Sequence, residues 1–136
     1  MNITEQSRKA AILNEAISAG DLSAAWQLLD NGVDAHAPDH FGQTPMFVAV
    51  RDGQPEIVSL LHSRGVDVNA PIERLYGRGP LYYAADYGHA EVARVLLDEG
   101  ANINAVESHG QSALWVCAMT LANEALSELS NPVIKG

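Results

Sequence analysis

The sequence from residue 39 to residue 70 reads DHFGQTPMFVAVRDGQPEIVSLLHSRGVDVNA, and from residue 74 to residue 105 it reads RLYGRGPLYYAADYGHAEVARVLLDEGANINA. Glycines and apolar residues recur at matching positions in the two stretches. A shorter copy follows at 107–119, and a weaker one precedes them at 11–37. Such a period is typical of an array in which each unit packs on its neighbours, so the repeat decides the fold.

The glycines occupy three positions of the repeat, and each set keeps its spacing apart from two extra residues within 71–76. An insertion confined to one connecting loop is what a repeat array tolerates. The loop at 71–79 is therefore predicted to be wider than the others. The three sets are Gly20, Gly53 and Gly88; Gly32, Gly65 and Gly100; and Gly42, Gly77 and Gly110.

Each unit is predicted to form two short helices. In the unit at 39–70, Thr44 is a good N-cap and Pro45 is favoured at the first helical position. Gly53 is expected to end this helix and Gly65 the next, because glycine accepts the left-handed conformation at a helix C-terminus. The apolar residues between these points recur every three and four residues, which places them on one face of each helix.

These units resemble the ankyrin repeat in TPMFVAV…DG…IVSLL…GVDVNA and in GPLYYAADYGHAEVARVLLDEGANINA. The resemblance covers residues 11–119 and implies an all-α solenoid of helix-turn-helix units with β-hairpin-like finger loops. The expected organisation is one domain over 1–136, with a capping repeat at 1–37, repeats at 38–70 and 71–105, and a curtailed repeat at 106–136. Whether the chain is part of a longer array is left open.

The sequence departs from the family at one position of the first helix. The family's Thr-Pro-Leu-His becomes TPMF, GPLY and SALW, so an aromatic residue replaces the histidine in each unit. The usual hydrogen bond between threonine and histidine is therefore absent, and we assign Phe47, Tyr82 and Trp115 to packing. Gly79 also leaves the third repeat without a hydroxyl cap, although glycine is tolerated there.

The composition is that of a folded protein, with 47% hydrophobic and 18% charged residues. No stretch approaches the roughly 18–20 apolar residues of a membrane helix, and the start shows no signal peptide. With Cys117 as its single cysteine, the chain is expected to be cytoplasmic and a monomer on its own. The net charge of −9 disfavours nucleic acid and suits a basic protein partner, although charge also serves solubility.

Residues that carry chemistry are sparse. The five histidines do not pair with cysteine or with one another at metal-ligand spacing, so no metal and no cofactor are expected. His89 lies in a turn common to the family and is given a structural role. Cys117 occupies the small-residue position of Ala49 and Ala84, which predicts packing rather than catalysis. The chain is therefore predicted not to be an enzyme.

The resemblance places a partner on the fingers and on the concave face of the first helices, and the distribution of the aromatic residues centres this surface on the third repeat. The aromatic residues Phe41, Tyr76, Tyr83 and Tyr87 are assigned to recognition, because aromatic side chains bury much area at low entropic cost. The predicted finger positions are His40, Phe41, Gln43, Leu75, Tyr76, Arg78, Ser108, His109 and Gln111. The predicted concave positions are Val48, Arg51, Asp52, Tyr83, Asp86, Tyr87, Val116, Met119 and Thr120.

Three functional classes compete. The first is a non-catalytic module that binds another protein. The second is a dedicated inhibitor, since small acidic ankyrin proteins resemble immunity proteins that neutralise a basic toxin or enzyme. The third, a small-molecule enzyme, requires a deep pocket that a solenoid of four units does not naturally form.

Overall fold

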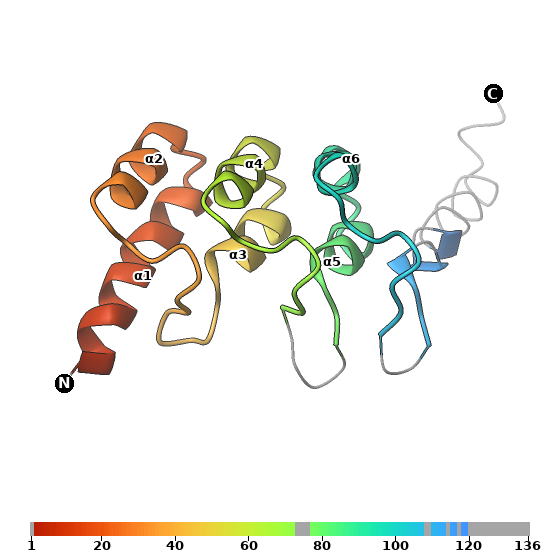
Figure 1. The fold of residues 1–136 in the computed structure, drawn as a ribbon, viewed down its shortest axis with the longest axis horizontal. Helices are drawn as coiled ribbons and strands as arrows, with labels where there is room; N and C mark the ends of the chain where they lie inside the picture. Colours follow the sequence, from red (N-terminus) through yellow and green to blue (C-terminus); the bar gives the residue numbers. More distant parts are fainter. Residues whose placement is uncertain (1, 73–76, 108–109, 114, 117, 120–136) are drawn as a thin grey trace, which may run out of the picture.

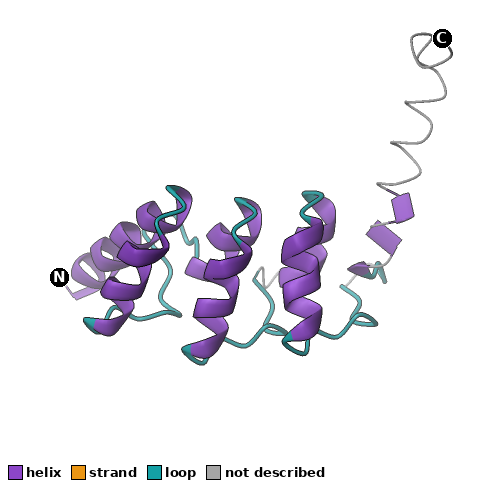
Figure 2. Cartoon of the chain, turned by 90° about the horizontal axis from the view of Figure 1, so that it is seen from above, coloured by secondary structure: helices purple, strands orange, loops and turns teal. Residues whose placement is uncertain are grey.

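A computed structural model describes residues 2–72, 77–107, 110–113, 115–116 and 118–119. Within these residues the named helices form three antiparallel pairs, which lie side by side in one row (Figures 1 and 2). The all-α solenoid expected from the repeat is confirmed. The helices are α1 (Asn2–Ser18), α2 (Leu22–Asp30), α3 (Pro45–Arg51), α4 (Pro55–Ser63), α5 (Pro80–Asp86) and α6 (Ala90–Asp98).

The helix boundaries follow the predicted local signals. Thr44 caps α3, with its Oγ1 accepting a hydrogen bond from the backbone N–H of Phe47 at 3.3 Å. Helix α3 ends at Asp52-Gly53, where Gly53 has a φ of 67°. Gly79 provides no side-chain cap for α5, as expected. The cap of α2 was not anticipated: Asp21 Oδ1 accepts from the N–H of Ala24 at 3.0 Å.

The core lies between two rows of helices. Helices α1, α3 and α5 pack in succession in an inner row, and α2, α4 and α6 pack in succession in an outer row. Helices α3 and α5 have only 7 residues each, too few to be stable alone, so their stability comes from this stacking. The largest fully buried side chains include Leu13, Ile17, Ile57, Leu61 and Leu96.

Helix α1 has 17 residues and is the longest member of the inner row. Its C-terminal half buries Ala10, Leu13 and Ile17, whereas Arg8 and Lys9 are exposed. In Figure 1 its N-terminal half runs down beside the first finger, the loop between α2 and α3. Gln6 in this half of α1 lines an open hollow together with Asp34 and Ala37 of that loop. No helix among the described residues is long and apolar enough to cross a bilayer.

Three fingers lie below the inner row, and a backbone hydrogen bond joins the two arms of each beside its turn (Figure 1). The first and third close from Asp39 N–H to the Gln43 carbonyl and from Glu107 N–H to the Gln111 carbonyl, both at 2.9 Å. The second closes from Ile72 N–H to the Arg78 carbonyl at 2.8 Å. Because this closure spans two more residues, the insertion expected near 71–76 lies inside the second finger.

Candidate functional site

Four aromatic side chains form a connected group on the inner helices, which we call the aromatic ladder: Phe47, Tyr82, Tyr83 and Tyr87. The rings of Phe47 on α3 and Tyr83 on α5 meet edge to face, with centroids 5.6 Å apart. Tyr83 also stacks on Tyr87 one turn later, at 6.2 Å and an interplanar angle of 23°. The ladder therefore joins two repeats through their aromatic rings.

A charged cluster adjoins the ladder at the end of α3. The Nε atom of Arg51 donates to Asp52 Oδ1 at 3.0 Å, and the hydroxyl of Ser18 donates to Asp52 Oδ2 at 2.9 Å. The Arg51 guanidinium also lies 5.6 Å from the centroid of the Phe47 ring. The hydrogen bond from Arg51 is the main reason that the pKa of Asp52 lies below its ordinary value, and the bond from Ser18 adds to it. The positive charge of Arg51 is therefore paired with the carboxylate of Asp52.

The first finger is organised by a buried carboxylate. Asp39 is 8% exposed, and its Oδ1 accepts from the N–H groups of Phe41 and Gln43, each at 2.9 Å. The side-chain amide of Asn14 donates to Asp39 Oδ2 and to the Gln43 carbonyl, both at 3.0 Å. Burial alone would raise the pKa of Asp39, but the bonds from Gln43, Asn14 and Phe41 hold it below its ordinary value.

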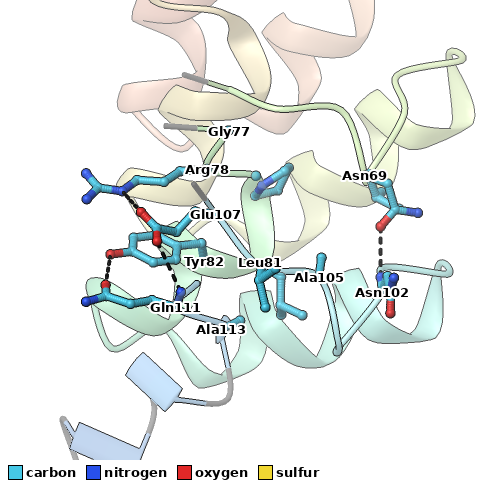
Figure 3. A pocket seen from close by; sticks show the side chains of 14 residues that line it. Asn69, Gly77, Arg78, Leu81, Tyr82, Asn102, Ala105, Glu107, Gln111 and Ala113 are labelled. Carbon is cyan, nitrogen blue, oxygen red and sulfur yellow. Dashed lines mark hydrogen bonds and ion pairs between the residues drawn. The ribbon is translucent and has the colours of Figure 1, made fainter. Parts of the chain in front are cut away.

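The third finger has a comparable organisation (Figure 3). The buried side chain of Glu107 lies 3.5 Å from Arg78 Nε, and its Oε1 accepts from the N–H of Gln111 at 3.1 Å. The hydroxyl of Tyr82 donates to Gln111 Oε1 at 3.4 Å, and Arg78 lies 5.0 Å from the centroid of the Tyr82 ring. The cavity between these groups is about 50 Å³, which suits ordered water rather than a substrate.

The predicted site residues differ in exposure. Among the exposed ones, Phe41 is 76% accessible on its finger, while Tyr87 and Met119 are each 44% accessible. His40 and Asp86 are also exposed, whereas Gln43, Arg51, Asp52, Arg78 and Tyr83 are half-buried. Leu75, Tyr76, Ser108, His109 and Thr120 lie outside the described residues.

Two predicted concave positions were wrong. Val48 is 1% exposed and Val116 is 6% exposed, so both belong to the core. They share a repeat position with Tyr83, which is itself half-buried and packs against the core. The valines at this position are therefore enclosed in the stack, whereas Tyr83 keeps part of its ring accessible beside the exposed residues Asp86 and Tyr87.

The packing assignment of the aromatic residues holds for two of three. Phe47 and Tyr82 are half-buried against the core, as expected. Trp115 is 47% exposed, so its assignment to packing was wrong. Asn14 and Tyr82 occupy the same repeat position as Trp115. Asn14 donates to the Gln43 carbonyl and Tyr82 donates to Gln111, each in the finger that follows its helix. The described residues include no finger after Trp115 that could cover its ring in the same way.

His89 has the structural role assigned to it. Its Nε2 atom lies 2.8 Å from the carbonyl oxygen of Arg51 in the preceding repeat. The described residues hold no group of three or more histidine, cysteine or acidic side chains placed to bind a metal ion. Cys117 lies outside the described residues.

Sequence reasoning missed Asn14 and Ser18 as neighbours of the predicted surface. The available signal was the repeat itself, because Asn14 precedes Phe47 by one period and Ser18 precedes Arg51 by one period. The first repeat is weak in sequence, which hid this correspondence. Ser18 is exposed and extends the polar side of the surface onto α1, whereas Asn14 is buried beneath the first finger.

Comparison with known proteins places these repeats among related sequences. The family model described as ankyrin repeats (3 copies) matches residues 13–107 and 76–132. Over 60 residues the chain is 40% identical to human protein phosphatase 1 regulatory subunit 27, a match covering 44% of this chain and 39% of the relative. Over 56 residues it is 45% identical to mouse 2-5A-dependent ribonuclease, covering 40% of this chain and 8% of the relative.

A third relative is an African elephant protein, named ankyrin repeat, SAM and basic leucine zipper domain-containing protein 1. It is 33% identical over 66 residues, which are 48% of this chain and 14% of the relative. The matches thus span about two fifths or less of the length of these relatives. The family model matches most of the chain, and with the helix pairs and fingers described above it shows that the chain belongs to the ankyrin-repeat family.

Proposed function

We propose that the protein is a non-catalytic module that binds another protein through the fingers and the exposed side of the inner helices. Ankyrin repeats imply a protein-protein interaction module. The observation that carries the finer proposal is the aromatic ladder, which runs across α3 and α5 and ends at the exposed ring of Tyr87. Rigid, partly exposed aromatic residues are the preferred anchors of protein interfaces.

The cavity of about 50 Å³ in Figure 3 is too small for a substrate, and the larger hollows of about 310 and 370 Å³ lie between α1 and the first finger and are open to solvent. One relative is named a regulatory subunit of a phosphatase, so a relative of this chain acts through another protein. The alternative, a dedicated inhibitor of a basic toxin or enzyme, would use the same surface. It differs only in that the bound partner would lose its activity.

The proposal is tested with a partner captured from native lysate and identified by mass spectrometry. The double variant Tyr83→Ala/Tyr87→Ala is expected to lower affinity at least about tenfold, since central aromatic anchors dominate interfaces. Circular dichroism checks that the variant is folded. Trp26 on the outer row is 52% exposed and gives a matched aromatic control, so Trp26→Ala should leave affinity unchanged.

Equal affinity of the double variant and the wild type would contradict the proposal, and so would a larger loss in the Trp26 variant. An activity assay on the captured partner then separates the two roles. A partner that keeps its activity in the complex indicates an adaptor, whereas a partner that loses it indicates an inhibitor.

A further inference from the structure

Most basic side chains of the described residues lie near a carboxylate of the same chain. The following each lie 2.6–3.8 Å from a carboxylate oxygen: Lys9, Arg51, Arg64, Arg78 and Arg94. Among the described basic residues, Arg8 on the exposed half of α1 has no such neighbour. The chain has 17 acidic residues against 8 basic ones, so the charge left for a partner is negative.

The acidic surplus reaches the end of the aromatic ladder at Asp86. Asp86 is exposed on the last turn of α5 and makes no ion pair or side-chain hydrogen bond with any part of the chain that the structure describes. The next residue is Tyr87, whose ring is 44% exposed and stacks on Tyr83. The Tyr87 ring also stacks on His89, with centroids 6.3 Å apart, so an exposed carboxylate without a cation and a partly exposed ring occupy successive positions of the chain.

The preceding repeat shows what this position lacks. Arg51 and Asp52 on α3 correspond in the repeat to Asp86 and Tyr87 on α5. In the second repeat the guanidinium of Arg51 lies against both the carboxylate of Asp52 and the ring of Phe47. In the third repeat Arg78 lies 5.0 Å from the centroid of the Tyr82 ring and faces Glu107, so among the described residues no cation lies against Asp86.

We infer that the partner is a protein with a basic segment, and that one of its arginine or lysine side chains binds against Asp86 and the ring of Tyr87. This inference rests on the proposed function and adds the chemistry of the bound segment. A cation over an aromatic ring gains electrostatic attraction, and the adjacent carboxylate adds an ion pair. The negative field of the whole chain would also speed the approach of such a partner.

The test is a selection of peptides from a random display library on the purified protein of 136 residues. Enriched peptides are expected to be rich in arginine or lysine, and their binding should weaken as salt is raised. Replacing the critical basic residue of an enriched peptide by glutamine should lower affinity. Separate peptides carrying arginine or lysine at that position then show which cation the surface prefers.

Two variants test whether the enriched peptide binds at Asp86 and Tyr87. Asp86→Asn and Tyr87→Leu are each expected to lower affinity for the enriched peptide about two- to fivefold, the usual size for exposed ion pairs and cation–π contacts. Asp98→Asn removes the same charge from an exposed position on α6 of the outer row and should leave affinity unchanged. Thermal melting of each variant checks the fold.

The outcomes separate this inference from the proposed function. Neutral or acidic peptides that need Tyr83 and Tyr87 would overturn the basic segment but support binding by the ladder. Basic peptides that are insensitive to Asp86→Asn, or equally sensitive to Asp98→Asn, would also overturn the inference. Peptides that bind undiminished to the Tyr83→Ala/Tyr87→Ala variant, or no enrichment at all, would overturn both.

Discussion

The Nε2 atom of His89 lies 2.8 Å from the carbonyl oxygen of Arg51, so the N-cap residue of α6 closes the C-terminal end of α3 in the preceding repeat. A carbonyl oxygen only accepts hydrogen bonds, so Nε2 is assigned the proton. The imidazole ring lies directly over Gly53, where a Cβ atom would be 2.9 Å from its Cε1 and Nδ1 atoms. His89 therefore joins two repeats and also limits the size of the side chain that position 53 can hold.

Gly53→Ala is expected to destabilise the protein by about 2 kcal/mol or more, because a left-handed φ of 67° and the contact with His89 act together. Gly88→Ala is the matched control: Gly88 has a φ of 73°, but a Cβ there meets nothing within 4 Å. Its cost should be about 1 kcal/mol. Urea unfolding of the two variants gives the difference, and equal losses would show that the imidazole does not restrict Gly53.

Asp39→Asn is expected to lower the free energy of unfolding by about 1–3 kcal/mol at neutral pH, because it replaces one accepting oxygen by a donating NH2 group in a buried site. The finger closure through Asn14 and Gln43 depends on those acceptors. The measurement is urea unfolding followed by circular dichroism. A loss no larger than that of the exposed control Asp98→Asn would contradict the role of the buried carboxylate.

The pH dependence of the same variant follows from the lowered pKa of Asp39. A carboxylate whose pKa is depressed by folding stabilises the folded state above its ordinary pKa of about 3.9, and this contribution is lost as pH falls through the folded value. The gap in unfolding free energy between wild type and Asp39→Asn should therefore narrow from neutral pH toward about pH 2. A constant gap would show that folding does not lower that pKa.

The sequence predicts the helical framework because its signals are local. Thr44, Pro45 and Gly53 act through their own backbone and the next turn, and the structure shows the cap and the stop where expected. Phe41, Tyr87 and Met119, which were predicted to face a partner, are exposed. These positions follow from counting along a repeat whose period is visible in the chain.

The contacts between neighbouring repeats could not be predicted from local sequence signals. Val48 and Trp115 were misassigned because exposure on an inner helix depends on the neighbouring repeat rather than on the helix itself. The second finger shows the same limit: the place of the insertion was predicted, but the closing pair of Ile72 and Arg78 was not. The link between Asn14 and Asp39 crosses 25 residues, and the weak first repeat hid the correspondence between Asn14 and Phe47.

Asn69 is expected to stabilise the junction between the second and third repeats. Its side-chain amide donates to the Gly100 carbonyl at 3.1 Å, and its Oδ1 accepts from the N–H of Asn102 at 2.8 Å. Asn69→Ala should therefore cost about 1–2 kcal/mol. Asn104 lies at the same position one repeat later, and its side chain makes no such bonds within the described residues. A thermal shift for Asn104→Ala as large as that for Asn69→Ala would argue against this role.

Gly79→Ser is expected to stabilise the protein, because it would supply the N-cap that α5 lacks. Gly79 has φ −96° and ψ −178°, an extended conformation open to serine, and its Cβ would meet only the Ala70 and Asn69 carbonyl oxygens at 3.9 and 4.0 Å. The expected gain is a few tenths to about 1 kcal/mol, from the cap and from a less flexible unfolded chain. Gly79→Ala separates these two contributions, because alanine restricts the unfolded chain but has no side-chain oxygen to cap α5. If the serine variant unfolds at no higher urea concentration than the alanine variant, the missing hydroxyl does not limit the stability of α5.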